Sequence, residues 1–418
     1  MKQQAKAPEA QCDYSIKSMP TDEAGFVFDV GSAYAYFEQI KDKRKARGRQ
    51  YALAAVLTLC VLGKLGGQNT PAGIADWVKH RADWLCEALG MKRRMTKRGQ
   101  VKMPCAGSYS RILSTALDAQ ALEKISSAFF ASQSASASAS VSARMVELCI
   151  DGKKVRGTIT PDKPNGEYLL AAYAPGVGVV LMQMLITPGE GELTVAPTVL
   201  KALNLQGKVI TGDALFAQRN LSLQIVQAGG DYVWKVKGNQ PALEASIASV
   251  FAPDSPASPG FSNPKKDLLS VRDVTAGHGR IEERVLTTSS LLTDYNDWPG
   301  LQQVFKYDCV VTDKHTGQRT ATTCYGITSL TAAQANPKRL LRIVRGHWRI
   351  ENGLHYRRDV LLHEDRCGLR LPQLVHVFAI LNNWVLGLFA LSGGGNFAAA
   401  QRRFNAHPEH ALELVLRA

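Results

Sequence analysis

The sequence predicts an α/β domain that follows an all-α region and contains a β-rich insertion. Three observations predict this class. Helical periodicity dominates the first 130 residues, whereas short apolar runs bounded by Gly or Pro alternate with helical segments from residue 144 onward. Residues 267–330 contain strand patterns and no convincing helix. A chain of 418 residues is long enough for two or three such structural units.

The first unit, residues 1–130, is expected to be a helical and strongly basic domain. A polar start precedes a basic run at residues 41–50, a helical segment from Tyr51 to about Leu89, and a second basic cluster at residues 91–102. The low-complexity Ser/Ala stretch at residues 131–143 is interpreted as a linker to the next domain.

Residues 144–266 are predicted to form the first part of the α/β domain. The order of patterns is strand, strand, strand, helix, strand, helix, strand. Short apolar runs within it stop at Asp151 and next to Asp213. Three antiparallel strands that lead into α/β units are the opening of a ribonuclease-H-like fold, so we expect that fold here.

The β-rich segment at residues 267–330 is expected to be an insertion within this domain. Helical patterns resume at residues 331–392, which are predicted to complete the domain. Residues 393–418 are predicted to be a C-terminal tail. Two long apolar runs, at 51–67 and 374–391, contain polar residues such as Lys64 and are interpreted as buried helices, not membrane spans.

The composition indicates a polyanionic partner. The apolar fraction of 45% and the charged fraction of 21% are ordinary for globular proteins, but the net charge of +14 is not. Such a charge favours nucleic acid first and an anionic membrane second. The eight cysteines lie singly without a CxxC pair, which argues against a zinc ribbon or a thioredoxin-like site and suggests reduced cytosolic thiols.

Three carboxylates are the candidate catalytic and metal-binding residues. Asp151 and Asp213 each follow a short strand, and neighbouring strands would bring them to one edge of the sheet. Glu351 follows about 140 residues later, in a helix rich in cationic side chains. Oxygen ligands suit Mg²⁺, with Mn²⁺ as a substitute, and two such ions roughly 3.5–4 Å apart can activate a nucleophile and stabilise the leaving oxygen of a phosphodiester.

The cations around Glu351 are expected to hold DNA phosphates that the carboxylates alone would repel. At about 3.6 residues per turn, His347, Glu351, His355 and Arg358 share one helix face, with Asn352 beside them. The residues predicted to contact DNA are Lys153, Lys237, Arg345, His347, Arg349, Asn352, His355 and Arg358.

Other interpretations of single residues stay open at this point. Asp151 and Asp213 are also typical of strand-ending turns, and Glu351 of a solvated helix surface. His355, Asp359 and His363 have a spacing that zinc ligands use, without a nearby fourth ligand.

The sequence resembles a known family over roughly residues 35–390. The segments that carry the resemblance are RGRQYALAAVLTLCVLG with IADW, IDGKKVRGT, VITGDALFAQ, DYVWKVKGNQ, GHGRIEER, YGITSL and HWRIENGLHYRRDVLLHEDRC. They resemble the DDE transposases of the H-repeat-associated (ISAs-one) insertion-sequence family. The resemblance implies cut-and-paste type transposition, with Asp151, Asp213 and Glu351 as the metal-binding triad. The wider superfamily often has Tyr, Arg and Lys at fixed offsets from the Glu, where this chain has Val344, His347 and Arg358.

The predicted function is therefore that of a Mg²⁺-dependent transposase, which cleaves insertion-sequence ends and joins them to target DNA by two-metal hydrolysis and transesterification. The alternatives are a ribonuclease-H-like nuclease without strand transfer and a catalytically idle DNA-binding protein derived from a mobile element. Residues 1–130 are expected to bind DNA or to assist its binding. The expected partners are double-stranded DNA, as inverted-repeat ends and target, and a second copy on paired ends. We expect no membrane partner and a cytoplasmic, nucleoid-associated location.

Overall fold

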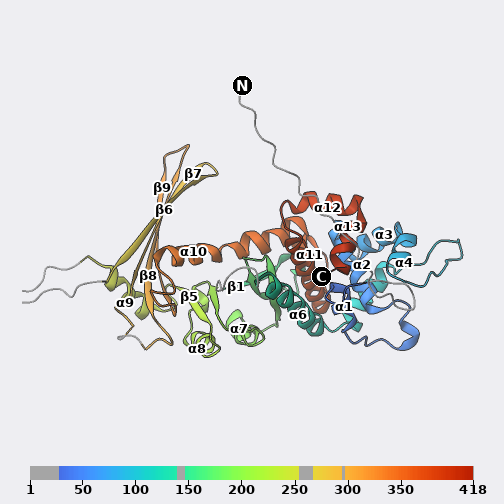
Figure 1. The fold of residues 1–418 in the computed structure, drawn as a ribbon, viewed down its shortest axis with the longest axis horizontal. Coiled ribbons are helices and arrows are strands. Elements are labelled where there is room, and N and C mark those ends of the chain that lie inside the picture. Colours follow the sequence, from blue (N-terminus) through green and yellow to red (C-terminus); the bar gives the residue numbers. More distant parts are fainter. Residues whose placement is uncertain (1–27, 139–145, 254–266, 294–296, 418) are drawn as a thin grey trace, which may run out of the picture.

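The computed structural model describes residues 28–138, 146–253, 267–293 and 297–417. The described elements lie along one long axis (Figure 1). Helices gather at one end, a nine-stranded sheet begins in the middle, and its hairpins project at the other end.

The N-terminal region is helical, as the sequence predicts. Its helices are α1 (Ala33–Glu38), α2 (Leu53–Leu65), α3 (Pro71–Lys79), α4 (Ala82–Ala88), α5 (Ala106–Arg111) and α6 (Ala119–Ser138), with a π-helical turn at Ile112–Ala116 and a 3-10 turn at Ala46–Gly48. Every residue of α2 is buried. Because α6 continues to Ser138, the first part of the linker predicted at residues 131–143 is helix. The rest of that stretch lies outside the described residues.

The order of elements after residue 145 is the predicted one. The strands are β1 (Val146–Val155), β2 (Glu167–Ala174), β3 (Val179–Ile186), β4 (Lys208–Gly212) and β5 (Asp231–Val236), and the helices are α7 (Glu192–Lys201), α8 (Arg219–Gln227) and α9 (Pro241–Phe251). Strand β2 pairs antiparallel with β1 and β3, whereas β4 pairs parallel with β1 and β5. This mixed sheet with flanking helices is a ribonuclease-H-like α/β fold, as predicted.

The β-rich segment continues the same sheet. It contains β6 (Leu269–Gly277), β7 (Arg280–Ser289), β8 (Gln303–Asp313) and β9 (Arg319–Thr328), and the sheet order is β3-β2-β1-β4-β5-β9-β8-β7-β6. The four strands were expected, but not their attachment: β9 pairs antiparallel with β5. At the β6–β7 turn, His278 and Gly279 have φ angles of 48° and 73°, as a two-residue type I′ hairpin requires.

The C-terminal part is mainly helical as far as Leu416. It contains α10 (Pro337–His347), α11 (Pro372–Leu391), α12 (Phe397–Ala406) and α13 (Pro408–Leu416), with π-helical turns at Glu351–His355 and Arg357–Leu361. The segment predicted as a C-terminal tail, residues 393–418, thus contains two helices within its described part. Helices α12 and α13 contact α2, and α13 also contacts α1 (Figure 1). The last helices of the chain thus cover its first ones.

Helix α11 lies at the centre of the molecule. It contacts α2, α6 and β3, and one cluster of buried apolar residues runs from Ala33 to Val415 through it. By length and composition α11 could span a membrane, but 89% of its most apolar stretch is buried in this structure. The helical region and the sheet therefore share one hydrophobic core.

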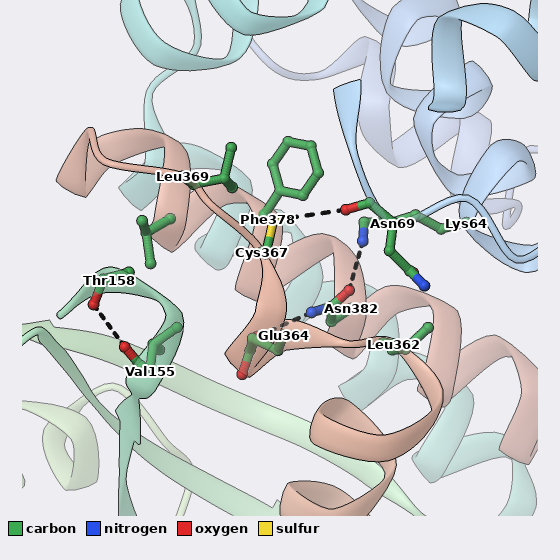
Figure 2. A pocket seen from close by; sticks show the side chains of 11 residues that line it. Lys64, Asn69, Val155, Thr158, Leu362, Glu364, Cys367, Leu369, Phe378 and Asn382 are labelled. Carbon is green, nitrogen blue, oxygen red and sulfur yellow. Dashed lines mark hydrogen bonds between the residues drawn. The ribbon is translucent and has the colours of Figure 1, made fainter. Parts of the chain in front are cut away.

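A buried polar network joins α2 to α11 beside a small cavity (Figure 2). The ammonium of Lys64 donates to Asn382 Oδ1 at 2.7 Å, and Asn382 Nδ2 donates to Glu364 Oε1 at 2.9 Å. Burial lowers the pKa of Lys64 to about 8. The cavity, about 10 Å³, is close to the minimum that one water needs. The network therefore fixes the helical region against the segment that follows α10.

Candidate active site

Two aspartates lie at one edge of the sheet because their strands run parallel. The parallel pairing of β1 and β4 ends at Cys149 and Thr211. Asp151 lies two residues beyond this point on β1, and Asp213 directly follows β4. The two side chains are close enough for the charge of Asp213 to raise the pKa of Asp151. Both carboxylates thus occupy the edge to which the carboxyl ends of the parallel strands point.

Glu351 reaches the same edge from the segment after α10. It begins the π-helical turn, and the Nδ1 atom of His355 lies 3.2 Å from its Oε2. The same Nδ1 lies 3.6 Å from Oδ2 of Asp151. One ligand atom from each of Asp151, Glu351 and His355 lies within 4.8 Å of the others. These three side chains are therefore close enough together to bind the same cation.

Asp213 is held separately by a histidine. Its Oδ1 lies 3.7 Å from His347 Nε2, and His347 Nδ1 lies 3.1 Å from the hydroxyl of Thr211 on β4. The neighbouring His347 lowers the pKa of Asp213, and the charges of Lys235 and Lys237 act in the same direction. Asp213 is thus ionised and oriented toward the edge where Asp151 lies.

A fourth carboxylate, Glu192, lies beside Asp151, although the sequence analysis did not select it. It stands in the first turn of α7 and forms a hydrogen bond with Tyr168. A Cβ atom at Gly152 would overlap the Glu192 carboxylate, so glycine is required for this close approach. The order and direction of the strands are the signal that could have identified Glu192. Since β3 runs in the same direction as β1, the helix that follows β3 begins at the same edge.

The electrostatics of the site favour a bound cation. Burial, together with the carboxylates of Asp213 and Glu192, raises the pKa of Asp151 to about 7. Burial also raises the pKa of Glu192. The crowding of carboxylates disfavours the charged forms unless a cation neutralises them. Burial and the charge of Arg358 lower the pKa of His355 to about 4, so its imidazole is neutral at pH 7.

The residues predicted to contact DNA divide into two groups by burial. Lys237, Arg345, Arg349 and Asn352 are exposed. They stay predictions.

The other four residues predicted to contact DNA are buried, namely Lys153, His347, His355 and Arg358. The prediction that they contact DNA directly is therefore wrong for this structure. Lys153 pairs with Asp359 at 2.6 Å, and Arg358, which is 0% exposed, pairs with Glu364 at 2.8 Å.

The two π-helical turns explain the error for Arg358. The helical face was derived from 3.6 residues per turn, but residues 351–355 and 357–361 form i to i+5 turns, which contain more residues per turn. Arg358 therefore points into the core, where it donates to Gln183 Oε1 at 2.7 Å. The alternative of a zinc site at His355, Asp359 and His363 is also unsupported, because two of these side chains have other partners. Asp359 pairs with Lys153, and His355 lies next to Glu351.

Comparisons with known proteins identify the family of the chain. The family model described as "Transposase DDE domain" matches residues 142–388, and the model described as "DDE_Tnp_1-associated" matches residues 34–130. "Putative transposase YncI" of Escherichia coli O157:H7 is 26% identical over 86% of this chain and 87% of that protein. "H repeat-associated putative transposase YhhI" of Escherichia coli K12 is 26% identical over 61% of this chain and 66% of that protein.

Other matches are more limited. "H repeat-associated putative transposase YbfD" of Escherichia coli K12 is 30% identical over 33% of this chain and 52% of that protein. The structure titled "Cryo-EM structure of piggyBac transposase synaptic complex with hairpin DNA (SNHP)" covers 91% of this chain and 80% of its own, at 12% identity and a TM-score of 0.40, which is too low to support an argument. The family models, together with the H-repeat-associated relatives, confirm the resemblance found in the sequence: the chain belongs to the DDE transposase family.

Proposed function

We propose that the protein cleaves DNA strands at the ends of an insertion sequence and joins them to target DNA. The observation that carries the proposal is the meeting of Asp151, Asp213 and Glu351 at one sheet edge, where burial and neighbouring carboxylates raise the pKa of Asp151 to about 7. A structural cluster would be expected to neutralise these carboxylates with lysine or arginine. Here, the basic side chains that lie within 4.0 Å of the three among the described residues are histidines, and that of His355 is neutral at pH 7.

The donor set fits Mg²⁺, with Mn²⁺ as a substitute. Asp151, Asp213 and Glu351 would hold the ions, because hard divalent cations prefer carboxylate oxygens. Glu192 is a further oxygen donor beside Asp151. When bound, such ions polarise the phosphodiester and stabilise the charge on the attacking and leaving oxygens.

The protein's own residues position this site. Asp151 lies within the part of β1 that pairs with β2, where its partner is Ala171. His347, itself in contact with Thr211, orients Asp213, and His355 orients Glu351. A site whose ligands are fixed by their neighbours loses little entropy when it binds its substrate.

DNA is the proposed substrate, as inverted-repeat ends and as target. The side chains of Lys237, Arg345, Arg349 and Asn352 are exposed and suited to phosphate oxygens. The charge of Lys237 acts on Asp213, and Arg349 and Asn352 lie within two residues of Glu351 in the chain. We further propose that residues 1–130 assist in end binding, that two copies act on paired ends, and that the protein is associated with the nucleoid. The net charge of +14 supports a polyanionic partner.

A cleavage and joining assay tests this function. The full chain would be incubated with Mg²⁺ and a plasmid that carries the inverted repeats found in the DNA next to its gene. The proposal expects metal-dependent nicks at the repeat ends, followed by products joined to a second plasmid. Nicks without joined products would indicate the nuclease alternative. Binding without nicks, in Mg²⁺ and in Mn²⁺, would indicate an idle DNA-binding protein and contradict the proposal.

A further inference from the structure

A stripe of exposed cations runs along α10. Lys338, Arg342, Arg345 and Arg349 are exposed at spacings of four, three and four residues, which places them on one face of the helix and its continuation. The opposite face is buried in the apolar cluster that includes strands β4, β5, β7 and β8. The sheet therefore fixes the helix with its cationic face outward.

The stripe borders a groove of about 600 Å³ between α10 and β6, the edge strand of the sheet. Six of the eleven residues that line this groove are cationic, and Asp273 is the acidic one. Asp273 is already engaged, at 2.8 Å from Arg345 and 3.6 Å from Arg284. Arg272 is also paired, with Glu283 at 2.9 Å. The positive charge that remains therefore lies on α10 and its continuation.

Two of these cations are free to bind a ligand. Among the described residues, Lys338 and Arg349 have no carboxylate within 4.0 Å, and Arg342 has only Glu147, at 4.0 Å. The side chain of Arg342 is 63% exposed. Exposed ion pairs of this length contribute little to stability, so a phosphate could displace Glu147 at little cost.

The groove lies beside the segment that carries Glu351. Arg349 lines it and stands two residues before Glu351 in the chain. From Lys338 to Arg349 the helix and its continuation rise about 16 Å, at 1.5 Å per residue. Since each strand of B-DNA advances about 3.4 Å per nucleotide, this length matches about five phosphates. A strand that follows the stripe would thus run along the helix toward the segment that contains Glu351.

We propose that the groove between α10 and β6 binds the phosphate backbone of the DNA strand that enters the active site. This inference rests on the proposed function, because it takes DNA as the substrate. The residues assigned to this contact are Lys338, Arg342 and Arg349. Arg345 would join them while its ion pair with Asp273 is kept. A second copy of the chain, paired along the β6 edge, is the competing occupant. The positive charge of the groove disfavours an identical copy and favours a polyanion.

The test uses the full chain and a fluorescent duplex of about 30 base pairs of arbitrary sequence. Its affinity is measured by anisotropy, without divalent metal, over a salt series from about 50 to 300 mM. The groove variant is Lys338→Gln with Arg342→Gln. The matched control is Lys201→Gln with Arg402→Gln, which removes two exposed cations from α7 and α12.

The groove variant should bind about tenfold more weakly at moderate salt, and its slope of log affinity against log salt should fall by about two. The control should keep the wild-type slope. A charge-retaining variant, Lys338→Arg with Arg342→Lys, should restore most of the affinity, which separates lost charge from lost folding.

Equal salt slopes for the groove variant and the control would overturn the inference. So would a groove variant whose DNA binding is normal but whose dimer content, in size-exclusion chromatography, is changed. These failures differ from failure of the proposed function. If the wild type binds through the groove but never nicks DNA, the groove stands and the cleavage proposal falls. If the wild type nicks DNA and the groove variant binds normally, only the groove inference falls.

Discussion

Each carboxylate of the site has a different neighbour, and this difference sets its charge. Asp213 is next to His347, which lowers its pKa, whereas Asp151 is buried between carboxylates, which raises its pKa to about 7. Glu351 contacts a histidine that burial keeps neutral. At the scale of single residues, the site therefore combines an ionised carboxylate with one whose ionisation a cation would stabilise.

Glu123 on α6 is a buried carboxyl group outside the site, and it makes stability depend on pH. Its Oε1 accepts a hydrogen bond from the backbone N–H of Gln183 at 2.6 Å. Burial raises the pKa of Glu123 from 4.5 to about 8. The pKa of Glu123 is higher in the folded protein than in the unfolded chain. Its contribution to the free energy of unfolding is therefore fully present below pH 4.5 and is lost as pH rises through 8.

Glu123→Gln should therefore flatten the dependence of stability on pH. The variant keeps the acceptor but cannot ionise, so it should unfold at a higher temperature than the wild type at about pH 8.5 and at a similar one at about pH 5. The full difference corresponds to about 3–5 kcal/mol. Glu87→Gln, an exposed glutamate on α4, is the control. Parallel pH profiles for the wild type and Glu123→Gln would show that Glu123 ionises freely in the folded protein.

The segment between α10 and α11 is the element in which the site and the buried network meet. Arg358 pairs with Glu364 and Gln183, while Glu364 also accepts from Asn382. Arg358→Ala would leave the Glu364 carboxylate buried without its guanidinium. Loss of one partner of a buried pair costs about 3–5 kcal/mol.

Denaturant unfolding of the full chain would measure this cost. Arg357→Ala, at the half-buried neighbouring position, should change stability much less. Low salt should not restore the stability of the Arg358→Ala variant, because a buried ion pair is little affected by screening. If both variants unfold at the same denaturant concentration, Arg358 does not stabilise this segment.

The sequence predicted most strands and helices, because their signals are local. The four strands from β6 to β9 follow alternating patterns bounded by Gly, Asp and Thr, and the structure contains them nearly as predicted. The pairing of β9 with β5 joins residues about a hundred positions apart, and no local pattern indicates it. Helices α12 and α13 did have local signals, since Asn396 caps α12 and Pro408 begins α13.

The site could be predicted only in part. Each triad carboxylate follows a recognisable strand or motif, and the structure brings Asp151 and Glu351 together through His355. The π-helical turns could not be derived, because a fixed period of 3.6 residues was the only guide to the face of that helix. Arg358, which looked like a DNA contact from its charge, is instead held in the core by partners from other elements.

At the scale of the whole molecule, the aromatic packing around α11 joins the helical region to the sheet. The ring of Trp384 lies 4.6 Å from Phe37 on α1 and 4.8 Å from Phe129 on α6, measured between centroids. Because these helices complete one core, the region 34–130 is not expected to fold as a separate unit.

Trp384→Ala should therefore destabilise the whole chain by about 3–5 kcal/mol, whereas Trp384→Phe should cost less. Hydrogen exchange followed by mass spectrometry would show whether protection falls in α1, α6 and β3 together. Loss of protection in the N-terminal helices alone would contradict a shared core.

The most direct test of the central claim is the metal-dependent nicking rate of the three triad variants on inverted-repeat DNA. Asp151→Asn, Asp213→Asn and Glu351→Gln each remove a ligand charge and little volume, so each should bind DNA nearly as the wild type does. Each should nick it at least about a hundredfold more slowly in Mg²⁺. Asp76→Asn, an exposed aspartate on α3, should keep the wild-type rate. A near-wild-type rate for any triad variant that binds DNA normally would remove that residue from the site and contradict the account.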